Sequence, residues 1–501
     1  MTPHTMRPPV THALLTLCLT LGHAKDKKQE HTLSPIEVSS DGHCLTLADG
    51  TPFFYLADTA WELFHRTTRQ EALLYLDTRA AQGFNVIQAV LLSELDGIGT
   101  PTPQGHRPLR DQDVLKPDTM AGPDNDYWDH ADYIISEANH RGMRVALLPS
   151  WGSYWHDSDI LNEHNARAYG RFLGQRYRDC GVLWVLGGDR PIEDARHMQV
   201  QRNLAAGLRE GGAKQPITFH PSGANGSSTW MQNEAWLTLH MRQNGHTDLY
   251  TGRYSRTLDD YHLSPTRPVI DGESTYEDHP IDFQPQHYGY STAQDVRHAF
   301  YWDVMNGACG HTYGHHSVWQ FYDGHRAPVN HPLLTWQEAL LQPGAQQMQH
   351  GRRLMESRPM LTRMPRPELI VTSAVPSAVP GEGRYRMVAC GDAQGTYAMI
   401  YTPTEGRAFA VDMRLLRATR IRVWWYDPCT GKAHKGGILV TPMRLTPSCH
   451  PSTPAAKTGC WCSTMPHATT PHLAREACNA DRGDEWMQNK NRQARTIILR
   501  T

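Results

Sequence analysis

The chain contains the stretch Val182-Leu183-Trp184-Val185-Leu186, which runs into Gly187-Gly188-Asp189-Arg190-Pro191. Its apolar run has the length of a strand that is buried on both faces, and the glycines mark its end. Similar apolar runs occur at residues 53–57, 84–90, 144–148, 216–219, 236–240, 268–270 and 308–312. Buried strands of this kind are typical of a parallel sheet that is covered by helices.

Helical stretches lie between these predicted strands. Thr68 and Glu71 have the spacing of a capping box at the start of one helix, and Gly83 follows its end. Further helices are predicted over residues 127–141, 163–178, 202–210 and 293–305. The alternation predicts an α/β fold, a (β/α)8 TIM barrel over residues 25–350. An open, doubly wound sheet has the same periodicity and is the alternative.

The pattern changes after residue 330. A polar helical stretch at 336–349 leads into short alternating strands at 369–371, 385–389, 397–401 and 421–426. The last of these strands is followed by Asp427-Pro428-Cys429-Thr430-Gly431, which has the composition of a turn. Residues 360–447 are therefore predicted to form a small antiparallel β-sandwich domain.

The first residues have the features of an export signal. Arg7 precedes a short apolar stretch at 13–21, and the small residues Gly22 and Ala24 suit a cleavage site. The apolar stretch is too short to span a bilayer. We therefore expect residues 1–24 to be a signal peptide, and the mature protein to be secreted, periplasmic or at the cell surface without a membrane span.

The end of the chain, residues 448–501, has an unusual composition. Between Ser448 and Thr496 the only Ile, Leu or Val is Leu473. Residues 459–462 can be translated back into the codons that could encode them. When those codons are read in the frame that starts at the third base, they encode aliphatic residues suited to a final strand. Our hypothesis is that a frameshift near Pro447 replaced the last strand with an aberrant, out-of-frame tail. A genuine disordered polar tail is the alternative.

The overall charge argues against a nucleic-acid partner. The formal net charge is -2 and the pI is about 7.0, so the chain lacks the basic surface expected of a nucleic-acid-binding protein. The 14 Trp and 20 Tyr residues offer flat faces with a polar edge, although ordinary core packing accounts for many of them. The composition does not indicate an oligomeric state.

Two acidic residues follow predicted strands. Asp189 lies after the fourth strand and Glu273 after the seventh. The carboxyl ends of barrel strands meet at one mouth, where two carboxyl groups can flank a glycosidic bond. One would act as an acid and the other as nucleophile or base. A plain ion pair between Asp189 and Arg190 is the alternative reading.

The other predicted strand ends carry aromatic, imidazole and amide side chains. Such groups suit a sugar, which has flat C–H faces and a ring of hydroxyls. For a single residue such as His240, a structural role is as well supported as a substrate contact. The candidate substrate-binding residues are Trp61, Asn85, Gln88, Trp151, His220, His240, His311, Tyr313 and Trp319.

Two other functions fit parts of this pattern. A non-catalytic carbohydrate- or matrix-binding protein would keep the aromatic side chains but would not need both carboxyl groups. A metal-dependent hydrolase is suggested by His311, His315 and His316. The i, i+4 spacing of His311 and His315 unites ligands only on a helix, and this segment has the pattern of a strand and loop. We expect no metal and no other cofactor.

Several motifs resemble the apiosidase-type glycoside hydrolases (glycoside hydrolase family 140). They are Asp58-Thr59-Ala60-Trp61-Glu62, Gly83-Phe84-Asn85-Val86-Ile87-Gln88, Gly187-Gly188-Asp189-Arg190-Pro191, Asp271-Gly272-Glu273 and Gly310-His311-Thr312-Tyr313-Gly314. Residues 424–431 resemble the small C-terminal β domain of that family, which is often labelled collagen-binding. The resemblance spans roughly residues 36–445.

The resemblance implies an (α/β)8 barrel in which Asp189 is the acid/base and Glu273 the nucleophile. It also implies a polysaccharide substrate, because the known activity of the family is release of apiose-linked side chains from the pectic polysaccharide rhamnogalacturonan II. Retention of anomeric configuration is expected from the resemblance of the barrel to other retaining enzymes. The family usually ends in an aliphatic strand followed by acidic residues, and this ending is absent in frame here.

Overall fold

The computed structural model describes residues 33–247, 249–250, 252–371, 382–403, 409–440 and 495–500. Eight parallel strands form one sheet in the order β8-β7-β6-β5-β4-β11-β10-β9. They are β4 (Tyr55–Thr59), β5 (Val86–Val90), β6 (Arg144–Leu148), β7 (Val182–Gly187), β8 (Ile217–His220), β9 (His240–Gln243), β10 (Val269–Glu273) and β11 (Gly310–Tyr313).

The sheet closes almost completely into a barrel. The two edge strands are adjacent, because Thr238 N donates to Ile217 O at 2.8 Å and Thr218 Oγ1 donates to Leu239 O at 2.8 Å. Every residue of β5, β6 and β7 is buried, as expected for parallel strands covered on both faces. The predicted TIM barrel is therefore confirmed. A short antiparallel sheet, β1 (Ile36–Val38), β2 (Leu45–Leu47) and β3 (Pro52–Phe53), precedes it.

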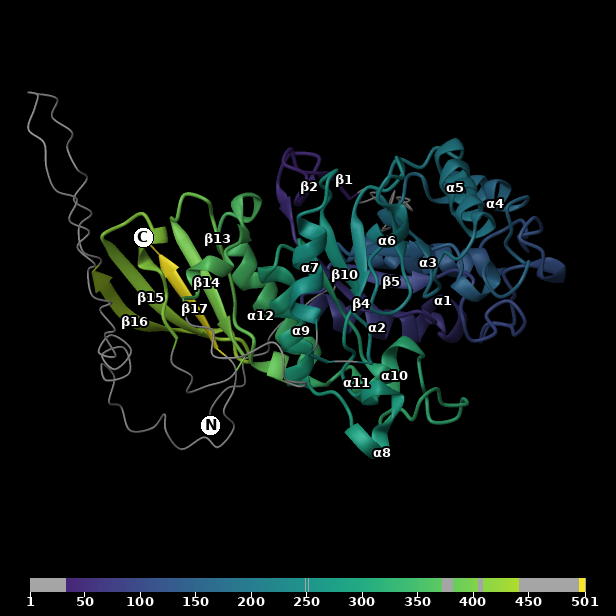
Figure 1. Cartoon of the computed structure of the whole chain (residues 1–501). Coiled ribbons are helices and arrows are strands. Elements are labelled where there is room, and N and C mark those ends of the chain that lie inside the picture. Colours follow the sequence, from purple (N-terminus) through teal and green to yellow (C-terminus); the bar gives the residue numbers. More distant parts are fainter. Residues whose placement is uncertain are drawn as a thin grey trace, which may run out of the picture. The chain divides into compact units, whose positions relative to one another are not determined.

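Helices surround the barrel strands (Figure 1). They are α1 (Leu63–Arg66), α2 (Arg69–Ala81), α3 (Tyr127–His140), α4 (Ala166–Tyr177), α5 (Ala195–Glu210), α6 (Ser228–Met231), α7 (Arg253–Tyr261), α8 (Pro285–Tyr288), α9 (Ala293–Met305), α10 (His316–Trp319), α11 (Trp336–Ala339) and α12 (Pro343–Glu356). The predicted capping box is present at α2, where Thr68 N donates to Glu71 Oε2 at 2.8 Å. Within the described residues, no helix has both the length and the apolar character needed to cross a membrane.

Two boundaries differ from the prediction in ways that matter for the site. The sixth strand begins at His240, where the prediction had it end, because its residues His240, Arg242 and Gln243 are polar yet fully enclosed. Hydropathy therefore does not reveal it. Helix α5 begins at Ala195 instead of residue 202, since Asp194 caps it by accepting a hydrogen bond from His197 N at 2.8 Å.

The C-terminal region contains one six-stranded antiparallel sheet in the order β12-β13-β14-β17-β15-β16. Its strands are β12 (Met364–Pro365), β13 (Val388–Gly391), β14 (Tyr397–Thr402), β15 (Arg420–Asp427), β16 (Lys432–Val440) and β17 (Arg495–Arg500). The predicted antiparallel domain is thus confirmed. The predicted strand at 369–371 is wrong: this segment follows the short η5 turn (Pro367–Leu369) and makes one bridge, from Ile370 to Val411.

Both faces of β13 and β14 are covered, whereas the edge strand β16 is mostly exposed. On one face, Met399 and Tyr401 pack with Phe300 and Trp302 of α9. On the other face, Ile400 joins an apolar cluster with the 409–416 segment. A layer of short loop segments takes the place that a second sheet would occupy in a sandwich, as far as the described residues extend.

The expectation that the final strand is missing is wrong. Residues 495–500 form β17, seen as the yellow arrow in Figure 1, which pairs with β14 on one side and β15 on the other. The low aliphatic content of 448–496 hid this strand, because its aliphatic residues Ile497, Ile498 and Leu499 come only at the very end. The expected export signal at 1–24 and residues 448–494 lie outside the described residues, so the frameshift hypothesis stays a prediction.

Candidate active site

Asp189 is placed by an unusual backbone turn at the end of β7. Gly187, Gly188 and Asp189 all have positive φ, at 87°, 108° and 58°. A Cβ at Gly187 would lie 2.4 Å from His220 O, and one at Gly188 would lie 2.7 Å from Gly152 N. Only glycine fits such a left-handed turn at this close approach. Positive φ at Asp189 itself is a local strain of the kind often found at functional sites.

Glu273 ends β10 and is 7% exposed. Nε2 of His220 lies 3.1 Å from one carboxylate oxygen, and Nε2 of His246 lies 3.0 Å from the other. Burial alone would raise the pKa of Glu273, but the interactions with His220 and His246 outweigh it and hold the pKa well below its usual range. Glu273 is therefore ionised at neutral and mildly acidic pH.

The tautomer of His220 follows from its backbone partner. The amide N–H of Asp189 lies 3.2 Å from Nδ1 of His220, and a backbone N–H can only donate. Nδ1 therefore carries the lone pair, and the ring proton sits on Nε2, which faces Glu273. One buried imidazole thus contacts the backbone of Asp189 and the carboxylate of Glu273.

The carboxyl group of Asp189 has the opposite electrostatic environment. Its pKa is raised, first by burial and then by the negative charge of Glu273, while His220, Gln243 and Arg190 oppose this to a lesser degree. Its side chain still keeps 36% of its surface exposed, so a ligand can reach it. One carboxyl group is thus held ionised and its neighbour is biased toward the protonated form, as an acid and a nucleophile require.

Two indole rings pack against His220, the imidazole that contacts Asp189 and Glu273. The ring centroids of Trp61 and Trp151 lie 5.4 Å and 6.0 Å from that of His220, and 5.4 Å from each other. Nε1 of Trp151 is buried and has no hydrogen-bond partner in the described part of the chain. Both indoles are almost fully buried, so they hold His220 in place. Their contact with substrate stays a prediction.

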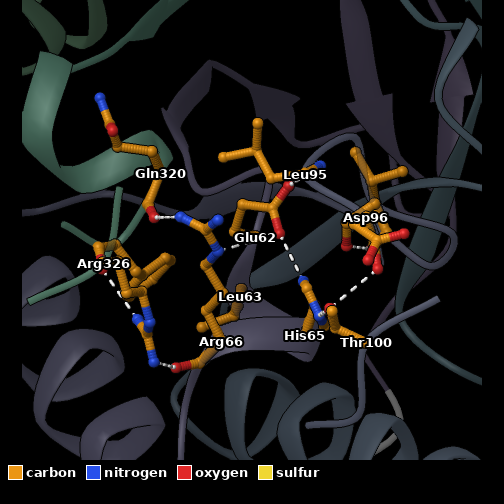
Figure 2. Close-up of polar contacts among 12 residues, drawn as sticks. Glu62, Leu63, His65, Arg66, Leu95, Asp96, Thr100, Gln320 and Arg326 are labelled. Carbon is orange, nitrogen blue, oxygen red and sulfur yellow. Dashed lines mark hydrogen bonds and ion pairs between the residues drawn. The ribbon is translucent and has the colours of Figure 1, made fainter. Parts of the chain in front are cut away.

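A third acidic side chain, Glu62, joins the loops at the mouth (Figure 2). Its buried carboxylate accepts from Leu95 N at 2.9 Å and contacts Nδ1 of His65 at 2.8 Å. Arg66 lies 3.7 Å away and donates to Gln320 O at 2.8 Å. Loops that follow β4, β5 and β11 are therefore fixed to one another. Trp319, a predicted contact, lies beside this network, where its carbonyl accepts from Glu62 N at 3.2 Å.

Glu94 was not predicted from the sequence. It follows β5, and its pKa is raised to about 8 by burial and by the negative charges of Glu62, Asp189 and Glu273. Glu94 therefore adds a protonated carboxyl group near Asp189 and Glu273 at neutral pH. His246 was missed as well, because the sixth strand was placed too early and its carboxyl end was not recognised.

Gln88 lies inside the barrel and does not reach the mouth. Its Nε2 donates to Gly272 O at 2.7 Å, and its Oε1 accepts from Tyr55 at 2.9 Å and from Thr312 at 3.3 Å. The prediction that Gln88 contacts substrate is therefore wrong. It supports the backbone next to Glu273, and all of its polar atoms are used within the protein.

Asn85 and His240 lie near the opposite ends of their strands from the mouth. Asn85 precedes β5, where it accepts from Leu56 N at 2.9 Å and donates to Phe54 O at 2.8 Å. His240 begins β9, and its Nδ1 lies 3.2 Å from Ser227 Oγ. Both predicted substrate contacts are wrong, because these side chains stabilise the backbone at the start of the strands.

His311 and Tyr313 alternate with Thr312, which faces the barrel interior, and so point outward to the helical layer. Nδ1 of His311 lies 2.9 Å from Asp303 of α9, and the Tyr313 hydroxyl donates to Glu277 at 2.6 Å. Both were predicted as substrate contacts, and the structure assigns them to packing between sheet and helices.

Two groups of described residues bring three metal-ligand side chains together: Asp271, Asp303 and His311, and His156, Glu193 and His197. The first group forms a buried hydrogen-bond network, in which Asn244 Nδ2 donates to Asp271 at 2.8 Å, while Nε2 of His311 has no hydrogen-bond partner among the described residues. Burial raises the pKa of Asp271 to about 7 and that of Asp303 to about 6, so this network retains protons. Asp271 in turn accepts from Glu273 N at 3.2 Å.

Comparisons with known proteins agree with this geometry. The model of the family "Apiosidase-like, catalytic domain" matches residues 39–362, and that of the "Putative collagen-binding domain of a collagenase" matches residues 365–452. No curated protein matches the chain.

Two similar solved structures are a glycoside hydrolase family 5 protein from Bacteroides vulgatus and a protein titled glycoside hydrolase. Each is 27% identical, with a TM-score of 0.75 over 93% of this chain, and the match covers 92% and 97% of their own lengths. The match to the apiosidase-like catalytic-domain model covers more than half of the chain. The chain therefore belongs to the apiosidase-like family and is a glycosidase.

Proposed function

We propose that the chain is an exported, retaining glycosidase that removes apiose-linked side chains from the pectic polysaccharide rhamnogalacturonan II, the activity of glycoside hydrolase family 140. The sugar specificity rests on the family resemblance and its motifs. The mechanism rests on one observation: His220 and His246 hold Glu273 ionised, while burial and Glu273 itself bias Asp189 toward the protonated form.

The reaction would proceed in two steps. In the first, Glu273 attacks the anomeric carbon while Asp189 gives its proton to the departing glycosidic oxygen. This leaves a glycosyl ester on Glu273 and an ionised Asp189. In the second, Asp189 removes a proton from water, the water oxygen displaces Glu273, and both carboxyl groups return to their starting states.

The loss of one negative charge from Glu273 in the first step would lower the pKa of Asp189. Glu273 is among the groups that raise the pKa of Asp189, so its esterification removes that contribution. Asp189 is then ionised over a wider pH range than it would be beside a charged Glu273, and so it is available to accept a proton in the second step. The arrangement therefore suits a residue that must act first as an acid and then as a base.

The roles can be separated with Asp189→Ala and Glu273→Ala and an external nucleophile. Both variants should lose roughly a thousandfold or more in kcat. Azide should restore turnover in each: the Asp189 variant should give a glycosyl azide of retained configuration, and the Glu273 variant one of inverted configuration. If the Asp189 variant gave the inverted azide and the Glu273 variant the retained azide, Asp189 would be the nucleophile and Glu273 the acid/base.

The substrate is tested by incubating the full chain with pectic oligosaccharides and identifying products by mass spectrometry and NMR. Release of a side chain that ends in apiose is expected, and its first-formed anomer gives the stereochemical outcome. Turnover of other glycans alone would reject the pectic assignment while leaving the two-carboxyl mechanism in place. Export is tested separately by N-terminal sequencing of the mature protein, which should begin after residue 24.

A further inference from the structure

His156, Glu193 and His197 form a compact group at the carboxyl end of the barrel. His156 follows the η2 turn (Gly152–Tyr154) after β6, whereas Glu193 and His197 follow β7. One ligand atom from each of the three side chains lies within 4.8 Å of the other two. Two imidazoles and one carboxylate are a common donor set for zinc and related divalent ions.

The ring of His156 is already oriented as a ligand. Its Nδ1 lies 2.6 Å from the carboxylate of Asp157, and its Nε2 lies 3.2 Å from Oε2 of Glu193. Nε2 is buried and makes no hydrogen bond to any residue that the structure describes. Imidazoles that bind metals commonly donate the other ring N–H to a carboxylate, which exposes the lone pair toward the ion.

The ring of His197 is held beside it. It is 5% exposed, and its centroid lies 4.5 Å from that of His156 and 5.4 Å from that of Trp155. Nδ1 accepts a hydrogen bond from Glu193 N at 3.3 Å and lies 3.8 Å from Asp194, and Nε2 lies 3.3 Å from the guanidinium of Arg196. Because Arg196 is one-third exposed and pairs with Asp159 at 2.9 Å, it can move aside without losing a partner.

We propose that His156, Glu193 and His197 bind one divalent ion of the zinc class through Nε2 of His156, one ring nitrogen of His197 and a carboxylate oxygen of Glu193, with water completing the shell. The ion takes no part in bond cleavage. It joins the loop after β6 to the loop after β7, and Trp155 connects the group to the active site by donating to Gly187 O at 2.9 Å. Asp157 also pairs with Arg190, which donates to Asp189 O at 2.9 Å.

The sequence had suggested His311, His315 and His316 as the histidines most suited to a metal. The structure does not bring these three histidines together as one ligand set. Nδ1 of His311 faces Asp303, Nδ1 of His315 accepts from Ser317 N at 3.1 Å, and Nε2 of His316 contacts Asn330 O at 2.8 Å. The spacing of residues does not reveal the group of His156, Glu193 and His197, because its ligands come from the loop after β6, the loop after β7 and the first turn of α5.

The proposal is tested on the full chain after dialysis against EDTA, by titration with Zn²⁺ in a calorimeter and with Co²⁺ in a spectrophotometer. One equivalent should bind, with visible Co²⁺ absorption from mixed nitrogen and oxygen ligands. His197→Ala and Glu193→Gln should each lose this equivalent, or weaken it at least tenfold. Arg196→Gln should bind several-fold more tightly, because a competing cation is removed.

Two controls distinguish the alternatives. His164→Ala changes an exposed histidine of the same loop and should bind as the unaltered chain does. Asp303→Asn tests the buried group. If Asp303→Asn loses the bound metal ion while His197→Ala still binds it fully, the ion sits in the buried group and the proposal is overturned. The proposal is also overturned if no metal binding is lost or weakened in His197→Ala. This readout is independent of catalysis, so a failure of the proposed glycosidase activity would not affect it.

Discussion

His220 allows the tuning of the two carboxyl groups to be tested directly. In His220→Ala, Glu273 loses the imidazole contact at 3.1 Å that helps to lower its pKa, and it keeps the contact with His246 at 3.0 Å. A hydrogen bond to a charged group contributes about 1.5–3 kcal/mol. Since about 1.4 kcal/mol corresponds to one pKa unit, the pKa of Glu273 should rise by roughly 1–2 units. Glu273 must be ionised to react, so the acidic limb of the kcat/KM profile should move to higher pH by the same roughly 1–2 units.

The assay is the pH dependence of kcat/KM for the substrate that the product screen identifies. The control is His240→Ala, which removes another buried histidine that contacts Ser227 and neither carboxyl group. It should lose stability without a change in the position of either limb. An acidic limb that stays in place in His220→Ala, or that moves equally in both variants, would refute the assigned interaction with Glu273.

Three further outcomes follow from the structure. Gly188→Ala should lower kcat and destabilise the protein by about 1–3 kcal/mol through backbone strain and contact with a neighbouring loop, whereas Gly223→Ala, whose new Cβ meets no atom within 4 Å, should be nearly neutral in activity and thermal unfolding. The pKa of Asp303 is about 6 when folded and about 3.9 when unfolded, so folding takes up a proton between these values and stability falls as pH rises through them. Asp303→Asn should flatten that decline by about 3 kcal/mol between pH 4 and pH 7, as measured by urea unfolding at each pH. Resequencing the gene across positions 447–495 should find two compensating frame changes, and an intact frame would reject them.

The barrel could be predicted from sequence because its strands are continuous apolar runs. Strands such as β7 are buried on both faces, and this enrichment is visible without any knowledge of partners. Strand β9 was misplaced because the polar residues His240, Arg242 and Gln243 obtain their burial and partners only after folding. A local hydropathy pattern carries no information about such tertiary compensation.

The last strand shows a second limit of the same kind. Residues 495–500 pair with β14 and β15, which are distant in sequence, so no local pattern indicates their place between them. Their presence also changes the frameshift hypothesis. A single shift near Pro447 would leave every later residue out of frame. If residues 495–500 are the native last strand, the hypothesis needs a second shift that restores the frame before them.

At the active site, strand ends were predictable but side-chain directions were not. Asp189 and Glu273 follow apolar runs directly, and the carboxyl ends of barrel strands always meet at one mouth. The direction of a side chain alternates along a strand, so a shift of one residue moves a candidate from the interior to the helical layer, as at His311 and Tyr313. The histidine that completes the Glu273 site, His246, lies after a strand whose end was misplaced. With the correct carboxyl end of β9, His246 would have been predicted at the mouth. The recognition of His246 as a partner of the Glu273 carboxylate therefore depends on that one strand boundary.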